Sequence, residues 1–385
     1  MAMSDYEKRG GKPRICVISS VAYLVLHPEL QGTGLGNVGG SALQVAWLSK
    51  ALVKEGFDVS LVTGDYGQKP LEIIDDIEIL KGPPRRTGLK QLFSWLFSTW
   101  KALDRADADI YYPRAMARGG TISFYCFLKR KKLVHPIDSD TRVRKRHFTL
   151  SEWRGWLSDY LARLDIRFAD VVIVQTEYQK DLLRKHFRKD GIVVRSIYPL
   201  LASIPIKSQP PVVLWVANLT KVKQAELFLK LAEEIPEVKF QMIGGVGEDL
   251  TFYELMEKKA SKIGNLEFLG FVPNPETNQY FDKASVFVNT STVEGFPNTF
   301  LEAWARCTPV VSLHVDPDEV ICKNQLGLHS KTFDQMVRDV KLLLTNGKLR
   351  ETMGLNGRKY IKKEHDANRV ATEYKKILLD LITKE

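Results

Sequence analysis

"FVNTSTVEGFPNTFLEAWARCTPVVS", residues 287–312, holds two short apolar runs with a helix-like segment between them. The first run, within "SVFVNTS", and the second, within "PVVSL", have the length and β-branched content of buried strands. A loop rich in Gly and Pro, "VEGFP", joins the first run to the segment "TFLEAWARC", which favours a helix. Because strands linked through a helix run parallel in one sheet, this stretch predicts a strand–helix–strand unit of an α/β fold.

The same alternation of strand and helix extends over both halves of the chain. In the first half the pattern predicts strands at 14–20, 58–63, 131–137 and 170–176, with a helix at 41–56. In the second half it predicts strands at 212–219, 239–245, 265–272, 285–291 and 309–313, and helices at 225–235, 251–263, 278–284 and 299–307. We therefore expect two tandem, doubly wound Rossmann-like domains that face each other across a cleft, with ligands at the carboxyl ends of the strands.

A proline-rich stretch marks the expected boundary between the two domains. The run "IYPLLASIPIKSQPP", residues 197–211, has four prolines and no periodicity, so it predicts a linker. The first domain is then residues 1–196 and the second is residues 212–365. Apolar residues recur at helical spacing in "ANRVATEYKKILLDLIT", so residues 366–385 are expected to form a helix that returns toward the first domain.

Composition excludes several protein classes. The chain has 385 residues, 44% hydrophobic and 26% charged, which is typical of a soluble protein with two ordinary domains. No apolar run approaches the roughly 18 residues needed to cross a bilayer. The start "MAMSDYEKRGGKPR" lacks the apolar core of a signal peptide, and the four cysteines have no paired metal-ligand spacing. We therefore expect a cytoplasmic protein with reduced thiols.

Positive charge is concentrated in one region. The net charge is +10, and residues 81–146 hold 16 basic and 5 acidic residues. Within this region "RRTGLKQLFSWLFSTWKAL", residues 85–103, predicts an amphipathic helix with an aromatic stripe, which suits an anionic membrane surface. The alternative is that the stripe packs on the sheet of the first domain. The residues expected to contact a membrane or acceptor are Arg85, Arg86, Lys90, Trp95 and Trp100.

The glycine-rich stretch "GLGNVGGS", residues 34–41, has the spacing of a dinucleotide-binding fingerprint. That fingerprint follows a strand directly, whereas about a dozen residues separate these glycines from the strand that ends near Ser20. Asp65 is an imperfect candidate for the ribose-binding acid. An NAD-dependent oxidoreductase or epimerase therefore stays an alternative. A basic nucleic-acid-binding protein is a second one, although it leaves the 287–312 loop unexplained.

The second half closely resembles the donor domain of the family 4 glycosyltransferases, which have the GT-B fold. The matching motifs occur in order as "FLGFVP" (268–273), "EGFP" (294–297), "LEA" (301–303) and "TPVV" (308–311). The first half is similar more loosely, through "GNVGGS", "GFDVSLVTG" and "ADVVIVQTEYQ". The resemblance implies an enzyme of the EC 2.4 class that transfers a sugar, with retention, from a UDP- or GDP-linked donor. It implies no metal, no cofactor and no nucleic-acid partner.

The resemblance also implies roles for individual residues. Glu294 would hold hydroxyls of the transferred sugar, Glu302 the nucleotide ribose, and Lys223 the leaving diphosphate. Asn218 stands where the family has an arginine, so Lys221 is the candidate substitute. His135 would lie beside the sugar. The remaining donor-binding candidates are Gly39, Gly40, Gly244, Gly245, Phe271, Val272, Gly295, Phe296, Pro297, Asn298 and Thr299.

Simpler interpretations exist for two of these acidic patterns. Thr299 and Glu302 have the spacing of a helix capping box, which would explain Glu302 without any ligand. Asp138 and Asp140 form an Asp-x-Asp pair, which binds a metal in the other glycosyltransferase fold, but tandem sheets with cationic phosphate binding need no metal. We therefore expect no metal ligands. The basic region favours an acceptor carried on a lipid, as in glycolipid, polysaccharide or glycoprotein-glycan assembly, at the cytoplasmic membrane face.

Overall fold

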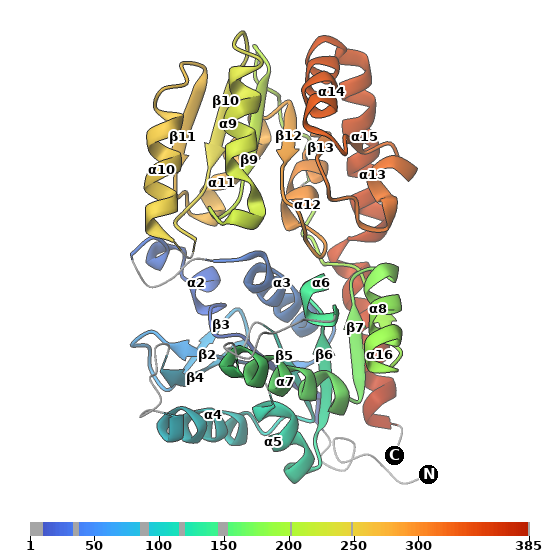
Figure 1. Cartoon of the computed structure of the whole chain (residues 1–385). Helices are drawn as coiled ribbons and strands as arrows, with labels where there is room; N and C mark the ends of the chain where they lie inside the picture. Colours follow the sequence, from blue (N-terminus) through green and yellow to red (C-terminus); the bar gives the residue numbers. More distant parts are fainter. Residues whose placement is uncertain are drawn as a thin grey trace. The chain divides into compact units, whose positions relative to one another are not determined.

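The computed structural model describes residues 11–33, 38–84, 92–114, 120–144, 153–200, 202–247 and 249–383. The chain divides into two compact units. The first comprises Met1–Ile197 together with Ala367–Glu385, and the second comprises Tyr198–Asp366. Each unit is a Rossmann-like sheet covered by helices on both faces (Figure 1), as the alternation of strands and helices predicts.

The sheet of the first unit is parallel except at one edge. Its strand order is β3-β4-β2-β1-β5-β6-β7-β8, and among the described strands only β3 and β4 pair antiparallel. The winding reverses between β1 and β5, which makes the sheet doubly wound. The strands are β1 (Arg14–Ile18), β2 (Asp58–Asp65), β3 (Leu71–Ile74), β4 (Ile77–Pro84), β5 (Ile110–Pro113), β6 (Lys132–Pro136), β7 (Val171–Val174) and β8 (Ile192–Val193).

The helices of the first unit cover the two faces of this sheet. They are α2 (Tyr23–Leu26), η1 (Pro28–Leu30), α3 (Gly40–Lys54), α4 (Leu92–Ala106), α5 (Thr121–Lys129), α6 (Asp140–Val143), α7 (Trp153–Phe168), α8 (Glu177–Phe187) and α16 (Ala367–Thr383). One core joins the sheet to α3 and α16, and the other joins it to α4, α5, α7 and α8. Among the described residues, no helix is both long and apolar enough to cross a membrane.

The last helix of the chain completes the core of the first unit. Val370, Tyr374 and Leu378 of α16 are buried among the residues of β1, β5 and α3. The hydroxyl groups of Tyr112 and Tyr374 lie 3.0 Å apart. The segment predicted as a linker, 197–211, begins at the boundary between the units, and its residues from Tyr198 onward cluster with the second unit. There the Lys207 ammonium donates to the carbonyl of Phe281 at 3.1 Å, so the segment is packed against that unit.

The amphipathic helix is α4, whose described part spans Leu92–Ala106. Arg85, Arg86 and Lys90 lie outside the described residues. Trp95 is only 4% exposed, and the ring of Trp100 packs 5.0 Å from that of Tyr125 on α5. Trp95 is therefore inside the first unit, whereas Trp100 is half-buried and packs against its core, which favours the alternative that the aromatic stripe packs on the first domain.

The second unit has an entirely parallel sheet. Its strand order is β11-β10-β9-β12-β13-β14. The strands are β9 (Val212–Val216), β10 (Lys239–Ile243), β11 (Leu266–Gly270), β12 (Val286–Asn289), β13 (Val310–Ser312) and β14 (Gly327–His329). The helices are η4 (Lys221–Lys223), α9 (Ala225–Glu233), α10 (Leu250–Ala260), α11 (Asn274–Lys283), α12 (Asn298–Ala305), η5 (Pro317–Glu319), α13 (Val320–Lys323), α14 (Phe333–Thr345) and α15 (Gly347–Glu364).

Close packing against α15 fixes the position of α12. A Cβ atom on Gly354 would lie 2.1 Å from the carbonyl oxygen of Cys307, just beyond the end of α12. A Cβ on Gly357 would lie 2.8 Å from the ring of Trp304, whose indole N–H donates to the carbonyl of Leu326 at 3.0 Å. The two glycines therefore let α15 approach α12 more closely than any other residue would.

This contact predicts the effect of one methyl group. Gly354→Ala should lower the free energy of unfolding by about 1–3 kcal/mol, because backbone atoms of Cys307 must move to admit the added carbon. The matched control is Gly264→Ala, where an added Cβ meets nothing within 4 Å. Urea denaturation of the two variants measures the difference. If both variants were as stable as the wild type, the backbone around Cys307 would have accommodated the added carbon at no cost, which contradicts the prediction.

Candidate active site

Two loops at the carboxyl ends of β9 and β12 are bound to each other. The Thr290 hydroxyl donates to the carbonyl of Lys223 at 2.6 Å and accepts from the indole of Trp215 at 3.0 Å. Two residues later the Thr292 amide donates to the carbonyl of Val222 at 2.9 Å. The loop that leads into α12 is therefore held against the η4 turn that follows β9.

This connection brings Lys223 and Glu294 together. The Lys223 ammonium donates to the Glu294 carboxylate, and the two side chains are 25% and 17% exposed. Partial burial makes an ion pair stronger than it would be in open solvent, since water screens it less. The two residues that the sequence singled out for sugar and diphosphate thus form one charge pair at the carboxyl edge of the second sheet.

Glu302 lies deeper, on the helix that follows this loop. It is 5% exposed, and burial raises its pKa to about 7, against the opposing effects of Arg306 and of a hydrogen bond from Asn274. The capping-box interpretation is wrong, because the residue before the first turn of α12 is Pro297 and its side chain caps nothing. Thr299 is already inside the helix, so Glu302 points from its second turn.

A buried arginine that sequence analysis missed holds this helix in place. Arg306 is 2% exposed. Its guanidinium donates to Asp282 at 2.7 Å, to the Tyr198 hydroxyl at 2.6 Å, to Asn278 at 2.5 Å and to the Glu302 carbonyl at 3.1 Å. The available signal was an arginine among the apolar residues of "LEAWARC", four residues after Glu302, since a buried charge requires partners.

Glycines bring the neighbouring loops into contact. A Cβ on Gly244 would lie 2.4 Å from the carbonyl oxygen of Ala217, and one on Gly245 would lie 2.9 Å from the ring of Phe271. The sequence did not single out Gly247, but the same constraint applies there. A Cβ on Gly247 would lie 2.3 Å from the carbonyl oxygen of Leu219. Packing between the loops after β9, β10 and β11 is thus sufficient to explain these glycines.

The other residues predicted to bind the donor in the second unit lie in or next to the same loops and differ in burial. Phe296 and Pro297 are buried, and the Phe296 ring packs 5.0 Å from that of His365. Lys221 is exposed. The half-buried candidates are Asn218, Val272, Phe271, Gly295, Asn298 and Thr299.

The candidates of the first unit are Gly39, Gly40 and His135. Gly39 precedes α3 and Gly40 begins it, while residues 34–37 lie outside the described part of the chain. Burial lowers the pKa of His135 on β6 to about 4, so its ring is neutral at pH 7. Its Nδ1 is buried and has no hydrogen-bond partner among the described residues.

The Asp-x-Asp pair is engaged by side chains of its own unit. The Asp138 carboxylate lies 3.6 Å from the Arg142 guanidinium, and the buried Asp140 accepts from the Gln179 amide at 3.0 Å. These contacts give both aspartates a structural role at the start of α6.

Comparison with known families decides the class of the protein. The family described as Glycosyl transferases group 1 matches residues 200–360, and the family described as Glycosyltransferase Family 4 matches residues 38–199. The chain belongs to the family 4, group 1 glycosyltransferases. It is therefore a transferase of the EC 2.4 class, and the dehydrogenase and nucleic-acid alternatives are not supported.

Individual proteins resemble this glycosyltransferase at low sequence identity. The α-monoglucosyldiacylglycerol synthase of Acholeplasma laidlawii is 29% identical over 52% of this chain and 51% of its own length. Sucrose-phosphate synthase of Thermosynechococcus elongatus superposes with a TM-score of 0.79 at 18% identity, covering 97% of this chain and all of its own. Anabaena HepE in complex with UDP and glucose gives 0.69 at 14% identity, covering 95% and 99%. These likenesses show the GT-B fold.

Burial of Glu302 predicts a pH dependence of stability. Its carboxyl stays protonated up to about pH 7 in the folded protein and ionises near 4.5, its ordinary value, once unfolded. The stabilising contribution is therefore complete below pH 4.5 and is lost as the pH rises through 7, amounting to about 3 kcal/mol. Relative to Glu302→Gln, the wild type should lose about this much between pH 4.5 and 8 in urea denaturation.

The exposed Glu226 on α9 offers the control for this experiment. Glu226→Gln should follow the wild type at every pH. A Glu302→Gln variant that also follows the wild type would show that burial does not hold the proton on Glu302.

Proposed function

We propose that this glycosyltransferase transfers a hexose from a nucleotide diphosphate sugar with retention, and that the second unit binds the donor through Lys223, Glu294 and Glu302. The observation that carries the proposal is the Lys223–Glu294 pair at the carboxyl edge of a parallel sheet, where ligands of such sheets bind. HepE binds UDP and glucose by the name of its structure, which supports a UDP-linked donor.

Donor binding would exchange the partners of the charge pair. Sugar hydroxyls donate to the Glu294 carboxylate, and the Lys223 ammonium turns to the diphosphate, so both groups stay compensated. The loop from Gly295 to Pro297 ends at the start of α12, where the positive end of the helix dipole attracts an anion. One loop thus supplies contacts to both the sugar and the diphosphate.

Glu302 is suited to two neighbouring hydroxyl groups of a ribose. As a carboxylate it accepts two hydrogen bonds, which offset the burial that otherwise keeps it protonated. Nucleotide binding near neutral pH would therefore release a proton from Glu302.

The chemical step needs charge stabilisation and no general base. The bond between the anomeric carbon and the acceptor oxygen forms on the face from which the diphosphate departs. The bond to the phosphate oxygen breaks, and that oxygen takes the acceptor proton. Lys223 neutralises the departing charge, with Lys221 as the second cation in place of the missing arginine. Asn218 donates hydrogen bonds only, and the neutral His135 would act on the sugar by hydrogen bonding. No metal enters this route.

Removing the Lys223 charge should slow transfer far more than it destabilises the protein. Lys223→Ala should reduce kcat with a UDP-sugar about 10²- to 10³-fold, because its charge acts mainly as the diphosphate departs. Lys258→Ala, an exposed lysine on α10, is the control and should retain the wild-type rate. Initial rates with UDP-, GDP- and ADP-sugars identify the preferred donor and measure the reduction of kcat. Full turnover by Lys223→Ala would assign the neutralising role to another cation.

We also propose an acceptor carried on a lipid, reached from the cytoplasmic face of an anionic membrane. The relative from Acholeplasma laidlawii synthesises a glycolipid by its name, which supports a lipid acceptor. The excess of positive charge in residues 81–146 favours an anionic surface.

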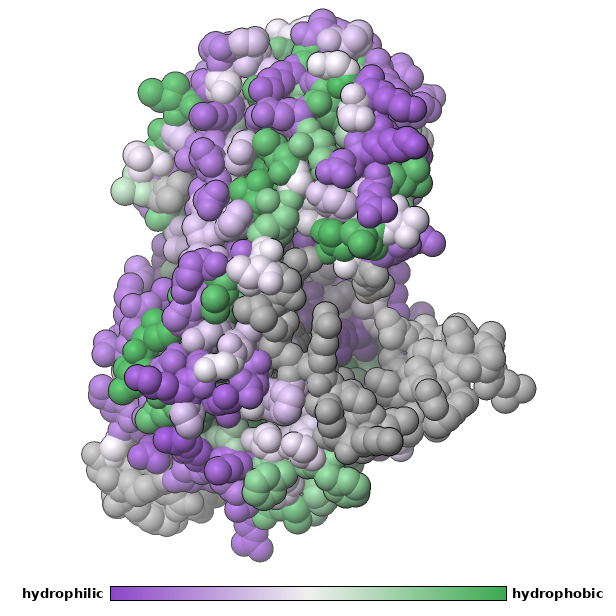
Figure 2. Space-filling view, turned by 90° about the vertical axis from the view of Figure 1, so that its left-hand side faces the viewer, coloured by the Kyte–Doolittle hydropathy of each residue, from purple (hydrophilic) through white to green (hydrophobic). Residues whose placement is uncertain are grey.

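The described residues offer an apolar face for that membrane. Phe93 and Phe97 of α4 are 83% and 71% exposed, and Phe124 and Phe127 of α5 are 57% and 77% exposed. The rings of Trp100 and Phe124 lie 6.2 Å apart, so the two helices form one surface, which we call the α4–α5 surface. Figure 2 shows hydrophobic residues at the lower edge of the face it views, the side on which α4 begins in Figure 1.

Exposed cations follow two of the exposed phenylalanines by about one helical turn. Lys101 on α4 and Arg130 at the end of α5 are exposed, as are the phenylalanines themselves. Apolar rings insert among lipid headgroups while basic groups attract anionic lipid, so the combination suits a membrane surface better than the core of a protein.

Binding to vesicles tests this surface. The full chain should co-sediment with anionic vesicles, less at high salt and less with neutral vesicles. Replacing Phe93 and Phe97 together by Ser should weaken binding at least about tenfold, since both rings are lost from the interface. Ile206→Ser, a 93% exposed residue of the second unit, is the control and should bind normally. Equal, negligible binding of the wild type to both vesicle types would favour a soluble acceptor.

A further inference from the structure

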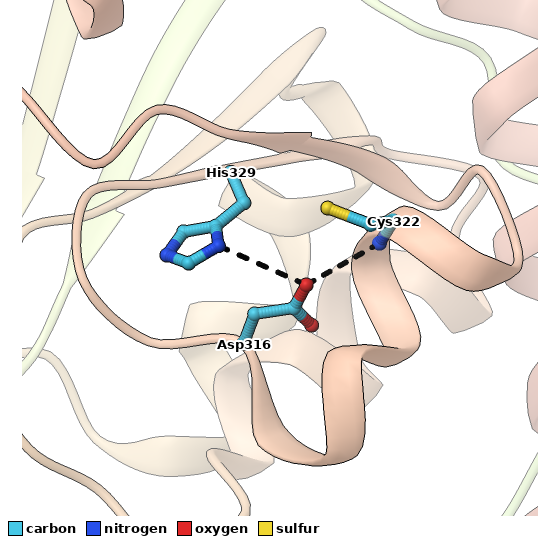
Figure 3. A group of neighbouring side chains, drawn as sticks. All are labelled: Asp316, Cys322 and His329. Carbon is cyan, nitrogen blue, oxygen red and sulfur yellow. Dashed lines mark hydrogen bonds and ion pairs between the residues drawn. The ribbon is translucent and has the colours of Figure 1, made fainter.

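Three side chains of different chemistry converge in the second unit, apart from the residues assigned to the donor. Asp316 precedes η5, Cys322 lies on α13 and His329 ends β14. One oxygen, sulfur or nitrogen atom from each residue lies within 4.8 Å of the others. Figure 3 shows the carboxylate, the thiol and the imidazole turned toward a common point.

We propose that Asp316, Cys322 and His329 bind a divalent transition metal, Zn²⁺ by preference. Zinc takes oxygen, sulfur and nitrogen ligands at about 2.0–2.3 Å, which places ligand atoms of a tetrahedral site about 3.4 Å apart. The Nδ1 atom of His329 is 3.9 Å from an oxygen of Asp316, so only a small contraction is required. Three protein ligands leave the fourth position to water.

The charges of the ligands match a divalent cation. A carboxylate and a thiolate together carry two negative charges, and a neutral imidazole adds none. Glu319 and Lys331, the other charged groups that act on the Cys322 thiol, have opposite signs, so their effects on it oppose each other. A bound Zn²⁺ would therefore leave the site close to neutral, and the thiolate makes zinc a better fit than calcium or magnesium.

Two of the ligands are held in place by the fold. The Asp316 side chain is 3% exposed, and its carboxylate accepts from the backbone N–H groups of Ile321 at 2.8 Å and Cys322 at 3.4 Å. His329 sits on β14 in register with Ser312 of β13. Such supporting contacts orient ligands before the metal arrives. Cys322 is exposed, so an ion can reach the site from solvent.

Capping of α13 explains Asp316 but leaves the other two residues unexplained. The helix needs an acceptor for its first amides, which the carboxylate provides. It does not need a thiol and an imidazole beside that acceptor. A metal at this point would tie α13 to β14, so it would stabilise the second unit, while the sugar-transfer step would not involve it.

Titration of the untagged full chain with metal tests the proposal. After treatment with EDTA and its removal, ZnCl₂ followed by calorimetry should show one ion per chain with a submicromolar Kd. CoCl₂ should give a thiolate-to-cobalt absorption band in the near ultraviolet. Cys322→Ser and His329→Gln should each weaken zinc binding at least tenfold and remove or shift that band. Cys307→Ser is the matched control, because its thiol lies near Arg358 and Lys207, and it should bind as the wild type does.

Three results would overturn the metal site. These are the absence of zinc binding to the wild type, unchanged affinity in Cys322→Ser, and a cobalt spectrum without the thiolate band. Circular dichroism establishes that each variant is folded before its titration is interpreted. Zinc should also raise the melting temperature of the wild type and leave the sugar-transfer rate unchanged, so the metal site and the proposed transfer reaction fail or succeed separately.

Discussion

The buried guanidinium of Arg306 organises the second unit. It bridges Tyr198 at the start of the unit, Asp282 and Asn278 on α11, and the backbone of α12. A buried charge is tolerated only when its donors are satisfied, so these elements are confined to one arrangement. Glu302 lies on the same helix, one turn before Arg306. The position of Glu302, the buried acid proposed to bind the donor, therefore depends on a hydrogen-bond and ion-pair network whose own residues are not among the proposed donor contacts.

Regular periodicity was enough to predict most of the framework. The helix expected from "ANRVATEYKKILLDLIT" is α16, Ala367–Thr383, because its apolar residues recur without a break over the whole segment. The face of α4 could not be predicted in the same way. Aromatic residues occur around much of that helix, and only its packing in the first unit decides that Trp95 is buried and Trp100 half-buried against Tyr125, while Phe93 and Phe97 are exposed. The local hydrophobic pattern predicts that a helix forms, whereas the face that it buries depends on neighbours that are distant in sequence.

Some residues of the candidate site could also be predicted from local sequence, and others could not. Lys223 and Glu294 stood out by residue type and motif, and their pairing follows from two loops at one sheet edge. Arg306 and the Asp316–Cys322–His329 group carry no recognisable spacing, because their partners are assembled from separate elements. The capping box failed for a local reason, since Pro297 takes the position that Thr299 would need.

The return of α16 to the first unit also bears on the order in which the molecule forms during synthesis. The second unit is one continuous segment, Tyr198–Asp366, so all of its residues leave the ribosome together and its core needs nothing that follows. The first unit lacks Val370, Tyr374 and Leu378 until α16 has been synthesised. Its core is therefore begun before that of the second unit but completed after it. Until then the apolar residues of β1, β5 and α3 that α16 covers stay partly exposed to water.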